Sequence, residues 1–329
     1  MSAARFLPGL TALLLGAVLA RGVELTLGFN HLLVAIALGF VLANAVGVPD
    51  RLEPGINTHK LWLGAGIVLM GASLTLETIL EVGGLVLLVV VAVTTLTIVL
   101  VELLARNVFG LADQLGSLLA AGSGICGVSA VVAVAGAIRA REEQIAYAAA
   151  TVLLFDAITI VVYPIVGDLL GLSDVVFGVW AGVSMFSTGP VVAVGFAHSE
   201  VAGQWATMAK LSRNALIGAV VIAYASYYAR SGSAGRPSLR TLWDEFPKFV
   251  LGFLALVALA SAGVFSSTQQ ASIENAYNWL FVLAFVGLGT EIQLAELRST
   301  GLTPALVVLL ALLVASAVSL VVLSMLFGT

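Results

Sequence analysis

Residues 120–136, which read AAGSGICGVSAVVAVAG, interrupt an apolar run with small and helix-breaking side chains. A simple membrane anchor would fill the same stretch with Leu, Ile and Val. Here Gly122, Gly124 and Gly127 favour an interrupted helix whose backbone groups are exposed at mid-depth. In lipid, such exposure is tolerated only where protein or a water-filled cavity supplies hydrogen-bond partners. We therefore expect the chain to handle a solute at this segment.

The composition indicates an integral membrane protein. Of 329 residues, 60% are hydrophobic and 10% are charged, and the mean hydropathy is +1.12, whereas soluble domains carry about 25% charged residues. The single cysteine, Cys126, excludes an intramolecular disulfide. The three histidines are scattered without metal-ligand spacing, and no basic run supports nucleic-acid binding. The residues after the first apolar stretch, RGVELTLG, form a poor cleavage site, so we expect a retained first helix.

Eleven apolar segments approach the roughly 20 residues that a membrane-spanning helix needs. They are 6–22, 31–48, 61–76, 84–105, 116–139, 143–166, 172–195, 203–229, 248–267, 276–292 and 302–327. The polar stretch 230–247 is predicted to be a surface loop with one short amphipathic turn.

The positive-inside rule predicts the orientation. If all eleven segments span, the N-terminal side holds Arg5, Arg51, Lys60, Arg106, Arg230, Arg236, Arg240, Lys248 and Arg298, and the other side holds Arg21, Arg139, Arg141, Lys210 and Arg213. A re-entrant hairpin at 116–139 would change this nine against five to eight against six. We therefore expect a multi-pass protein of the cell (plasma) membrane with a cytoplasmic N-terminus.

Two pairs of segments resemble each other within the chain. Residues 69–83 align with 287–301 at an offset of 218, and residues 121–134 align with 181–194 at an offset of 60. One simple duplication cannot produce both offsets. What the segments share is a set of related helix-breaking residues.

A helix break between Gly124 and Gly127 would create an anion site. The half-helix that starts near Val128 would present free N–H groups at its positive end. The hydroxyls of Ser123 and Ser129 could add hydrogen bonds. The alternative is that these small residues serve close helix packing. Cys126 is expected to behave as a small buried hydrophobe.

A second breaker cluster lies in WAGVSMFSTGP, residues 180–190. Ser184, Ser187 and Thr188 precede Gly189 and Pro190, and the proline removes a backbone donor. This cluster predicts either a second unwound segment that faces the first across a cavity, or a surface loop between two helices.

Four charged side chains fall inside or near apolar segments. A central Asp such as Asp156 costs roughly 2.5–3.5 kcal/mol on insertion scales, so it suits proton coupling or cation coordination, or a hydrogen bond to a neighbouring helix. Lys210 and Arg213 share a helix face beside Asn214; they suit a dianionic substrate, or they snorkel to headgroups. Glu291 stands near a predicted helix end, where it could be solvated.

At these residues the chain resembles the sulfate exporter family, the YeiH-like membrane proteins. The run GSGICGVSAVVAVAGAIRAREEQIAYA carries the resemblance, together with GAGIVLMGASLTL (64–76), FGVWAGVSMF (177–186) and ATMAKLSRNALIG (206–218). Two departures stand out: Phe186 and Ser187 replace a polar pair of many members, and Asp156 replaces a small residue.

The resemblance implies a polytopic transporter whose fold is related to cation/proton antiporters and bile-acid symporters. Such folds use two discontinuous helices that cross near the midplane, and here 116–139 would pair with 276–292. Residues 1–329 would form one membrane-embedded domain. It would comprise an extra first helix (1–28) and inverted repeats of about 30–166 and 172–329.

We therefore expect an all-α secondary transporter that exports a small anion, such as sulfate, sulfite or an organosulfonate, by alternating access. The predicted substrate-binding residues are Ser123, Gly124, Cys126, Gly127, Ser129, Ser184, Thr188, Lys210 and Arg213, and the predicted coupling residues are Asp156 and Glu291. The expected partners are the small anion and the lipid bilayer, without nucleic acid, and such folds allow a homodimer. No cofactor or metal is expected; the coupling ion would be Na⁺ or H⁺.

Two alternatives stay open. The first is a sodium/proton antiporter-like exchanger that uses Asp156. The second is an intramembrane enzyme or a sensor, but neither H-E-x-x-H nor G-x-S-x-G occurs, so the chain is not expected to be an enzyme.

Overall fold

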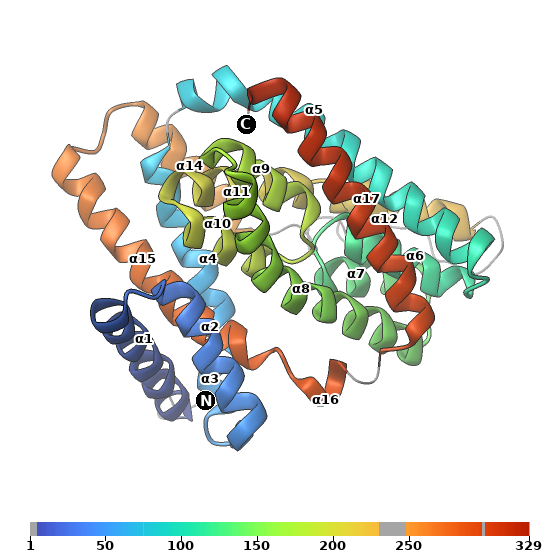
Figure 1. The fold of residues 1–329 in the computed structure, drawn as a ribbon, viewed down its shortest axis with the longest axis horizontal. Helices are drawn as coiled ribbons and strands as arrows, with labels where there is room; N and C mark the ends of the chain where they lie inside the picture. Colours follow the sequence, from blue (N-terminus) through green and yellow to red (C-terminus); the bar gives the residue numbers. More distant parts are fainter. Residues whose placement is uncertain (1–4, 75, 230–247, 298–299, 329) are drawn as a thin grey trace. The chain divides into compact units, whose positions relative to one another are not determined.

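The computed structural model describes residues 5–74, 76–229, 248–297 and 300–328, and these residues form helices and connections without a strand (Figure 1). The predicted all-helical fold is thereby confirmed. The chain divides into two compact units. Unit 1 comprises Met1–Gly84 and Lys248–Leu294, and unit 2 comprises Leu85–Pro247 and Ala295–Thr329. The loop predicted at 230–247 lies outside the described residues.

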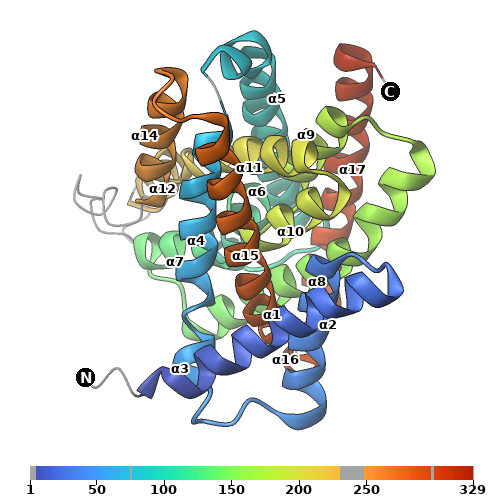
Figure 2. The same ribbon diagram turned by 90° about the vertical axis from the view of Figure 1, so that its left-hand side faces the viewer.

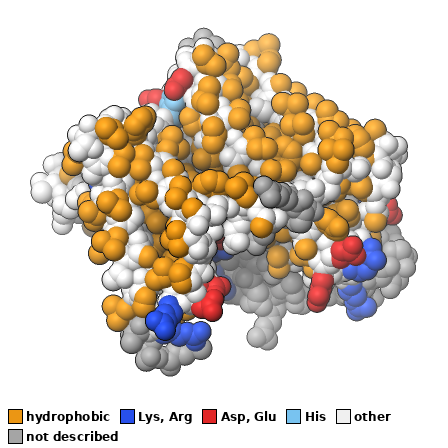
Figure 3. All heavy atoms as spheres, turned by 60° about the horizontal axis from the view of Figure 1, so that its bottom comes forward, with side chains coloured by type: hydrophobic (Ala, Val, Ile, Leu, Met, Phe, Trp, Pro, Cys, Tyr) orange, Lys and Arg blue, Asp and Glu red, His pale blue; other side chains and the backbone are white. Residues whose placement is uncertain are grey.

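Five helices are long and apolar enough to cross a membrane: Leu7–Leu27, Gly83–Val108, Glu142–Leu170, Glu200–Ala229 and Leu302–Phe327. Large apolar side chains on them face outward; Leu169 is 80% exposed, for example. Figure 3 shows hydrophobic side chains over large parts of the visible surface, with charged side chains in a few small groups. These features support a polytopic membrane protein.

Unit 1 is built around one long helix. Helix α15 packs against α2 and α4, and Figure 2 shows α4 and α15 side by side. Glycines allow this contact, because a Cβ on Gly39 would lie 2.0 Å from the carbonyl oxygen of Val286. The elements of unit 1 are α1 (Leu7–Leu27), α2 (His31–Val41), η2 (Leu42–Val46), α3 (Glu53–Ile56), α4 (His59–Met70), η3 (Gly71–Ser73), α14 (Phe249–Ser261) and α15 (Ser267–Thr290).

Unit 2 holds the helices that surround the segment 120–136. Helix α5 (Leu76–Leu103) begins in unit 1 and continues into unit 2, and the short α16 (Leu294–Leu297) lies at the other junction. The remaining elements are η4 (Leu104–Val108), α6 (Asp113–Gly124), α7 (Val128–Ile138), α8 (Glu142–Leu170), α9 (Asp174–Ser184), α10 (Thr188–His198), α11 (Glu200–Asn214), α12 (Ile217–Ala229) and α17 (Leu302–Phe327).

Helices α6 and α7 form a hairpin, called hairpin 1 here, whose tip is residues 125–127. The side chain of Gln114, near the start of α6, donates to the carbonyl oxygen of Ile138, the last residue of α7, at 3.1 Å. The two arms have 12 and 11 residues, and at 1.5 Å per residue neither can cross a hydrocarbon core of about 30 Å. Segment 116–139 therefore has the geometry of a re-entrant hairpin, the alternative named above, and not that of a single continuous span.

Helices α9 and α10 form hairpin 2, whose tip is residues 185–187. The ring of His198, at the end of α10, stacks on Phe177 near the start of α9, with centroids 4.0 Å apart. Its Nε2 lies 3.6 Å from Asp174 Oδ1, at the first residue of α9. The predicted segment 172–195 is therefore also folded back on itself, and both arms have 11 residues.

The two hairpins break at equivalent positions. Arm α6 ends at Gly124 and α9 ends at Ser184; arm α7 starts at Val128 and α10 starts at Thr188. Both pairs differ by the offset of 60 found in the sequence. The partner that the resemblance implied, 276–292, does not have such a break, because α15 runs continuously from Ser267 to Thr290.

Candidate functional site

The tips of hairpins 1 and 2 touch. Gly127 has φ +69°, a left-handed conformation that favours glycine, and a Cβ on it would lie 2.0 Å from Ser187 Oγ. Gly127 thus meets two requirements, the turn from α6 into α7 and the close approach of hairpin 2. This contact brings the two breaker clusters of the sequence together.

Lys210 of α11 is fully buried and binds both tips. Its ammonium donates to Ile125 O at 2.8 Å in hairpin 1, and to Met185 O at 3.2 Å and Phe186 O in hairpin 2. An ammonium has three N–H donors, and all three find a carbonyl. The positive charge of Lys210 is therefore accommodated by backbone that the helix breaks set free.

Arg213, one helical turn later on α11, does the same with its guanidinium. It donates to Ser123 O and Gly124 O at the end of α6, and to Met185 O at 2.6 Å. These are carbonyls at helix C-termini, which lack intrahelical partners. Lys210 and Arg213 thus neutralise the negative ends of α6 and α9.

Asp156 stands at the middle of α8 and is 3% exposed. Its Oδ1 accepts a hydrogen bond from the backbone N–H of Ser187 at 3.0 Å. Ser187 is the N-cap residue of α10, so the carboxylate faces the positive end of that half-helix. Opposite charges therefore lie at opposite helix ends in one site.

Part of this site is accessible. Ser129 of α7 is exposed, and Cys126, Ser187 and Thr188 are half-buried. The hydroxyl of Ser123 is buried without a hydrogen-bond partner among the described residues. The accessible polar groups lie at the N-terminal ends of α7 and α10, where backbone N–H groups lack carbonyl partners within their own helix.

Ser184, another predicted binding residue, is engaged within hairpin 2. Its hydroxyl donates to Trp180 O and accepts from Tyr163 Oη at 2.9 Å. The rings of Tyr163 and Trp180 stack with centroids 4.1 Å apart. These contacts give Ser184 a structural part in hairpin 2.

Glu291 belongs to unit 1, whereas the other predicted site residues belong to unit 2. Its carboxylate lies 2.7 Å from Lys60 Nζ and 3.5 Å from His59 Nε2. The structure thus groups nine predicted binding residues and Asp156 in one unit, and places Glu291 in a separate ion pair. No set of three His, Cys, Asp or Glu side chains in the described part of the chain is arranged to hold a metal ion.

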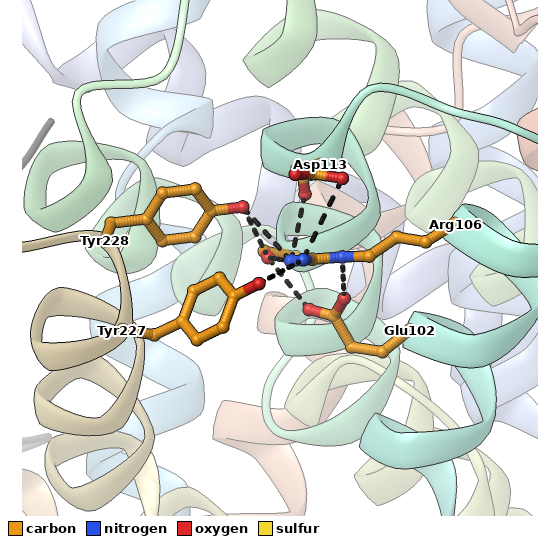
Figure 4. A network of polar contacts seen from close by, with 6 residues as sticks. Glu102, Arg106, Asp113, Tyr227 and Tyr228 are labelled. Atoms are coloured by element: carbon orange, nitrogen blue, oxygen red, sulfur yellow. Dashed lines mark hydrogen bonds and ion pairs between the residues drawn. The ribbon is translucent and has the colours of Figure 1, made fainter. Parts of the chain in front are cut away.

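Sequence reasoning missed a polar network at the base of hairpin 1, shown in Figure 4. Arg106 pairs with Glu102 at 2.5 Å and donates to Ser117 Oγ of α6 at 2.8 Å. It also donates to the hydroxyls of Tyr227 and Tyr228 of α12, at 3.0 and 3.1 Å. A groove of about 490 Å³ between α5 and α12 lies beside it. The one sequence signal was the i,i+4 spacing of Glu102 and Arg106.

Sequence reasoning also gave no role to Asn214, the last residue of α11. Its Nδ2 donates to Thr188 Oγ1 at 3.0 Å, so Asn214 reaches the start of α10. Its position directly after Arg213 was the available signal.

Comparison with known proteins places the chain in a family. The family described as "Conserved hypothetical protein 698" matches residues 8–308 of the chain. A "UPF0324 membrane protein" of Nitratidesulfovibrio vulgaris is 34% identical over 282 residues, which cover 84% of this chain and 78% of the relative. Proteins of the same name from Clostridium tetani and Bacillus cereus are 32% and 33% identical; they cover 82% and 83% of this chain, and 82% and 80% of their own lengths.

No solved structure is significantly similar to the chain. The names of the relatives state that they are membrane proteins and specify no substrate. Membrane localisation is thereby supported, and sulfate export remains a prediction.

Proposed function

We propose that this chain, which belongs to the family described as "Conserved hypothetical protein 698", is a secondary transporter that exports a small anion by alternating access. The observation that carries the proposal is the meeting of two helical hairpins tip to tip around buried charges. Discontinuous helices whose ends point at a solute site are a recurring feature of secondary transporters.

The cost of the arrangement supports a transport role. Non-helical backbone at membrane depth is tolerated only where protein or water satisfies it, and two fully buried cations are used to satisfy the tips. A protein that needed only stable packing could continue each helix without a break. The charged groups are thus better explained by a polar site inside an apolar protein.

The charge of the site favours an anion. Lys210 and Arg213 contribute two positive charges and Asp156 one negative charge. The start of α7 adds the positive end of a helix dipole, beside the exposed hydroxyl of Ser129. A sulfate, sulfite or organosulfonate-like anion matches these donors, and Asp156 is the candidate group for coupling to H⁺ or Na⁺.

The charges at the two ends of unit 2 support one orientation in the membrane. The end where hairpin 1 opens carries Arg106, Arg139 and Arg141, and the end where hairpin 2 opens carries Asp168 and Asp174. Helix α8 connects these ends and is long enough to span. By the positive-inside rule, hairpin 1 would enter from the cytoplasm and hairpin 2 from the other side. A cytoplasmic N-terminus in the plasma membrane is part of this proposal.

A second candidate function is cation exchange through Asp156. The observation that favours it is a carboxylate buried at the middle of α8, where a charge is rarely placed without function. It ranks second because two buried cations lie at the same tips.

The test is flux into proteoliposomes that contain the purified full chain. Labelled sulfate, sulfite and aminoethanesulfonate are offered under an inward or outward H⁺ or Na⁺ gradient. We expect gradient-dependent flux of at least one anion. Flux no greater than that of empty liposomes for every anion would overturn the proposal, and gradient-driven H⁺/Na⁺ exchange without anion flux would establish the second candidate.

A further inference from the structure

The buried charges of unit 2 sum to one positive charge. Among the described residues of this unit, the charged side chains that are buried are Asp156, Lys210 and Arg213, at 3%, 0% and 0% exposure. All three side chains form direct hydrogen bonds with backbone groups of the hairpin tips. Uncompensated charge is costly in a low-dielectric interior. A monoanion neutralises this site, whereas a dianion leaves it with a net negative charge.

Asn214 adds an acceptor beside these charges. The residue is 4% exposed, and its Nδ2 donates to Thr188 Oγ1. Its Oδ1 is buried and has no hydrogen-bond partner in the described part of the chain. An unsatisfied buried acceptor costs about 1–3 kcal/mol, so a solute that donates to it gains that interaction.

Thr188 provides a hydrogen-bond donor next to the acceptor of Asn214. Because its Oγ1 accepts from Asn214, its own hydroxyl proton is available to a solute. Thr188 is half-buried and is the first residue of α10, so this donor lies among the N–H groups at the start of that helix. A hydroxyl donor and an amide acceptor therefore lie next to each other at the start of α10.

We infer that the transported solute is a monoanion that carries its own hydrogen-bond donor, and that Asn214 recognises this donor. The inference rests on the proposed anion transport and deepens it. The anionic group would accept from Thr188 and the half-helix N–H groups. A hydroxyl of the same molecule would donate to Asn214 Oδ1. Lys210 and Arg213 alone would suit a dianion. Because Asp156 binds the same tips and lowers the net charge of the site to one positive charge, we expect a monoanion instead.

Three probes separate these features. Ethanesulfonate is a monoanion without a donor, 2-hydroxyethanesulfonate differs from it by one hydroxyl, and sulfate is a dianion at neutral pH. Binding to the full chain in detergent is measured by the slowing of thiol labelling at Cys126, the single cysteine, which lies half-buried at the tip of hairpin 1. Thermal shift gives a second readout.

In the wild-type protein, 2-hydroxyethanesulfonate should bind at least about tenfold more tightly than ethanesulfonate, because a site built to pair with a hydroxyl rejects the analogue that lacks it. Sulfate should bind most weakly of the three. This comparison needs no variant, so it does not depend on whether any substitution folds.

The variants then assign the discrimination to Asn214. Asn214→Leu and the smaller Asn214→Ala, which both lack an acceptor, should bring the two sulfonates to equal affinity. Thr188→Val, the matched control, should weaken both sulfonates and preserve the ratio between them. Asn214→Asp should weaken every anion, because the added carboxylate cancels the net charge of the site.

Two failures are distinguishable. If none of the three anions slows labelling of Cys126 and none is transported, the proposed anion transport fails. If anions bind but ethanesulfonate binds as tightly as its hydroxyl analogue, or sulfate binds most tightly, anion transport stands and the inference about Asn214 is overturned.

Discussion

The ammonium of Lys210 lies 2.8 Å from the carbonyl oxygen of Ile125, a residue 85 positions earlier in the chain. The same ammonium also binds the tip of hairpin 2. A single side chain of α11 thus satisfies backbone groups that two separate helix breaks release.

Replacing this lysine should destabilise the protein. In Lys210→Met the side-chain volume is nearly kept, but three carbonyls lose their donor, which should cost about 3 kcal/mol. Thermal unfolding of the purified protein in detergent measures the loss. Lys248→Met, at an exposed lysine that precedes α14, is the control and should leave the unfolding midpoint unchanged. Equal midpoints for Lys210→Met and wild type would contradict the assigned contacts.

Gly127→Ala should separate the tips. A methyl group there would collide with Ser187 Oγ and would strain a backbone at φ +69°, so we expect a loss of about 2 kcal/mol. The double variant Gly127→Ala/Ser187→Ala should recover the part due to the collision. Gly136→Ala, in the same hairpin with open space around its Cβ position, should be neutral or slightly stabilising. A Gly127→Ala protein as stable as Gly136→Ala would refute the contact.

Asp156→Asn should change the preferred charge of the solute. The amide oxygen can still accept from the Ser187 N–H, whereas the site gains one unit of net positive charge. Sulfate should therefore gain affinity relative to ethanesulfonate, by about tenfold, and flux should lose its dependence on the H⁺ or Na⁺ gradient. Competition with Cys126 labelling and proteoliposome flux check the two parts. An unchanged affinity ratio would place Asp156 outside the solute site.

The orientation is tested with two single cysteines in a Cys126→Ser background. Glu143→Cys, at the start of α8, should be labelled by a membrane-impermeant reagent only from the cytoplasmic side. Ser173→Cys, just before α9, should be labelled only from the opposite side. Both positions are exposed. Labelling of both from one side would exclude opposed hairpins.

The helices themselves could be predicted from the sequence, because their positions follow apolar length. The breaks could be predicted too: glycine and serine at 122–129 and the S-T-G-P run at 187–190 end and restart helices where the structure has them. The direction of the chain after each break could not. Only a tertiary contact such as Gln114 to Ile138 distinguishes a hairpin from a span, since both have the same hydrophobic length.

Glycine in an apolar segment fits either a helix break or close packing of two helices, and only tertiary contacts distinguish them. The resemblance implied a discontinuous helix at 276–292, but the glycines in this segment allow close packing: a Cβ on Gly289 would lie 2.1 Å from Ile36 O. The partners of Lys210 and Arg213 were equally hidden, because their acceptors are backbone carbonyls far away in sequence. The offset-60 match corresponds to equivalent helix breaks in the two hairpins, but the sequence alone could not distinguish it from a chance similarity of Gly-, Ala- and Val-rich segments.

The bonds from α11 also constrain how the site can open. Lys210 and Arg213 each donate to both hairpins, so neither tip can withdraw without breaking its own hydrogen bonds to α11. We therefore expect the two hairpins to move together with α11 as one rigid body. Under the proposed transport function, we expect access from the two sides of the membrane to alternate through motion elsewhere in the protein, while the two hairpins hold the solute.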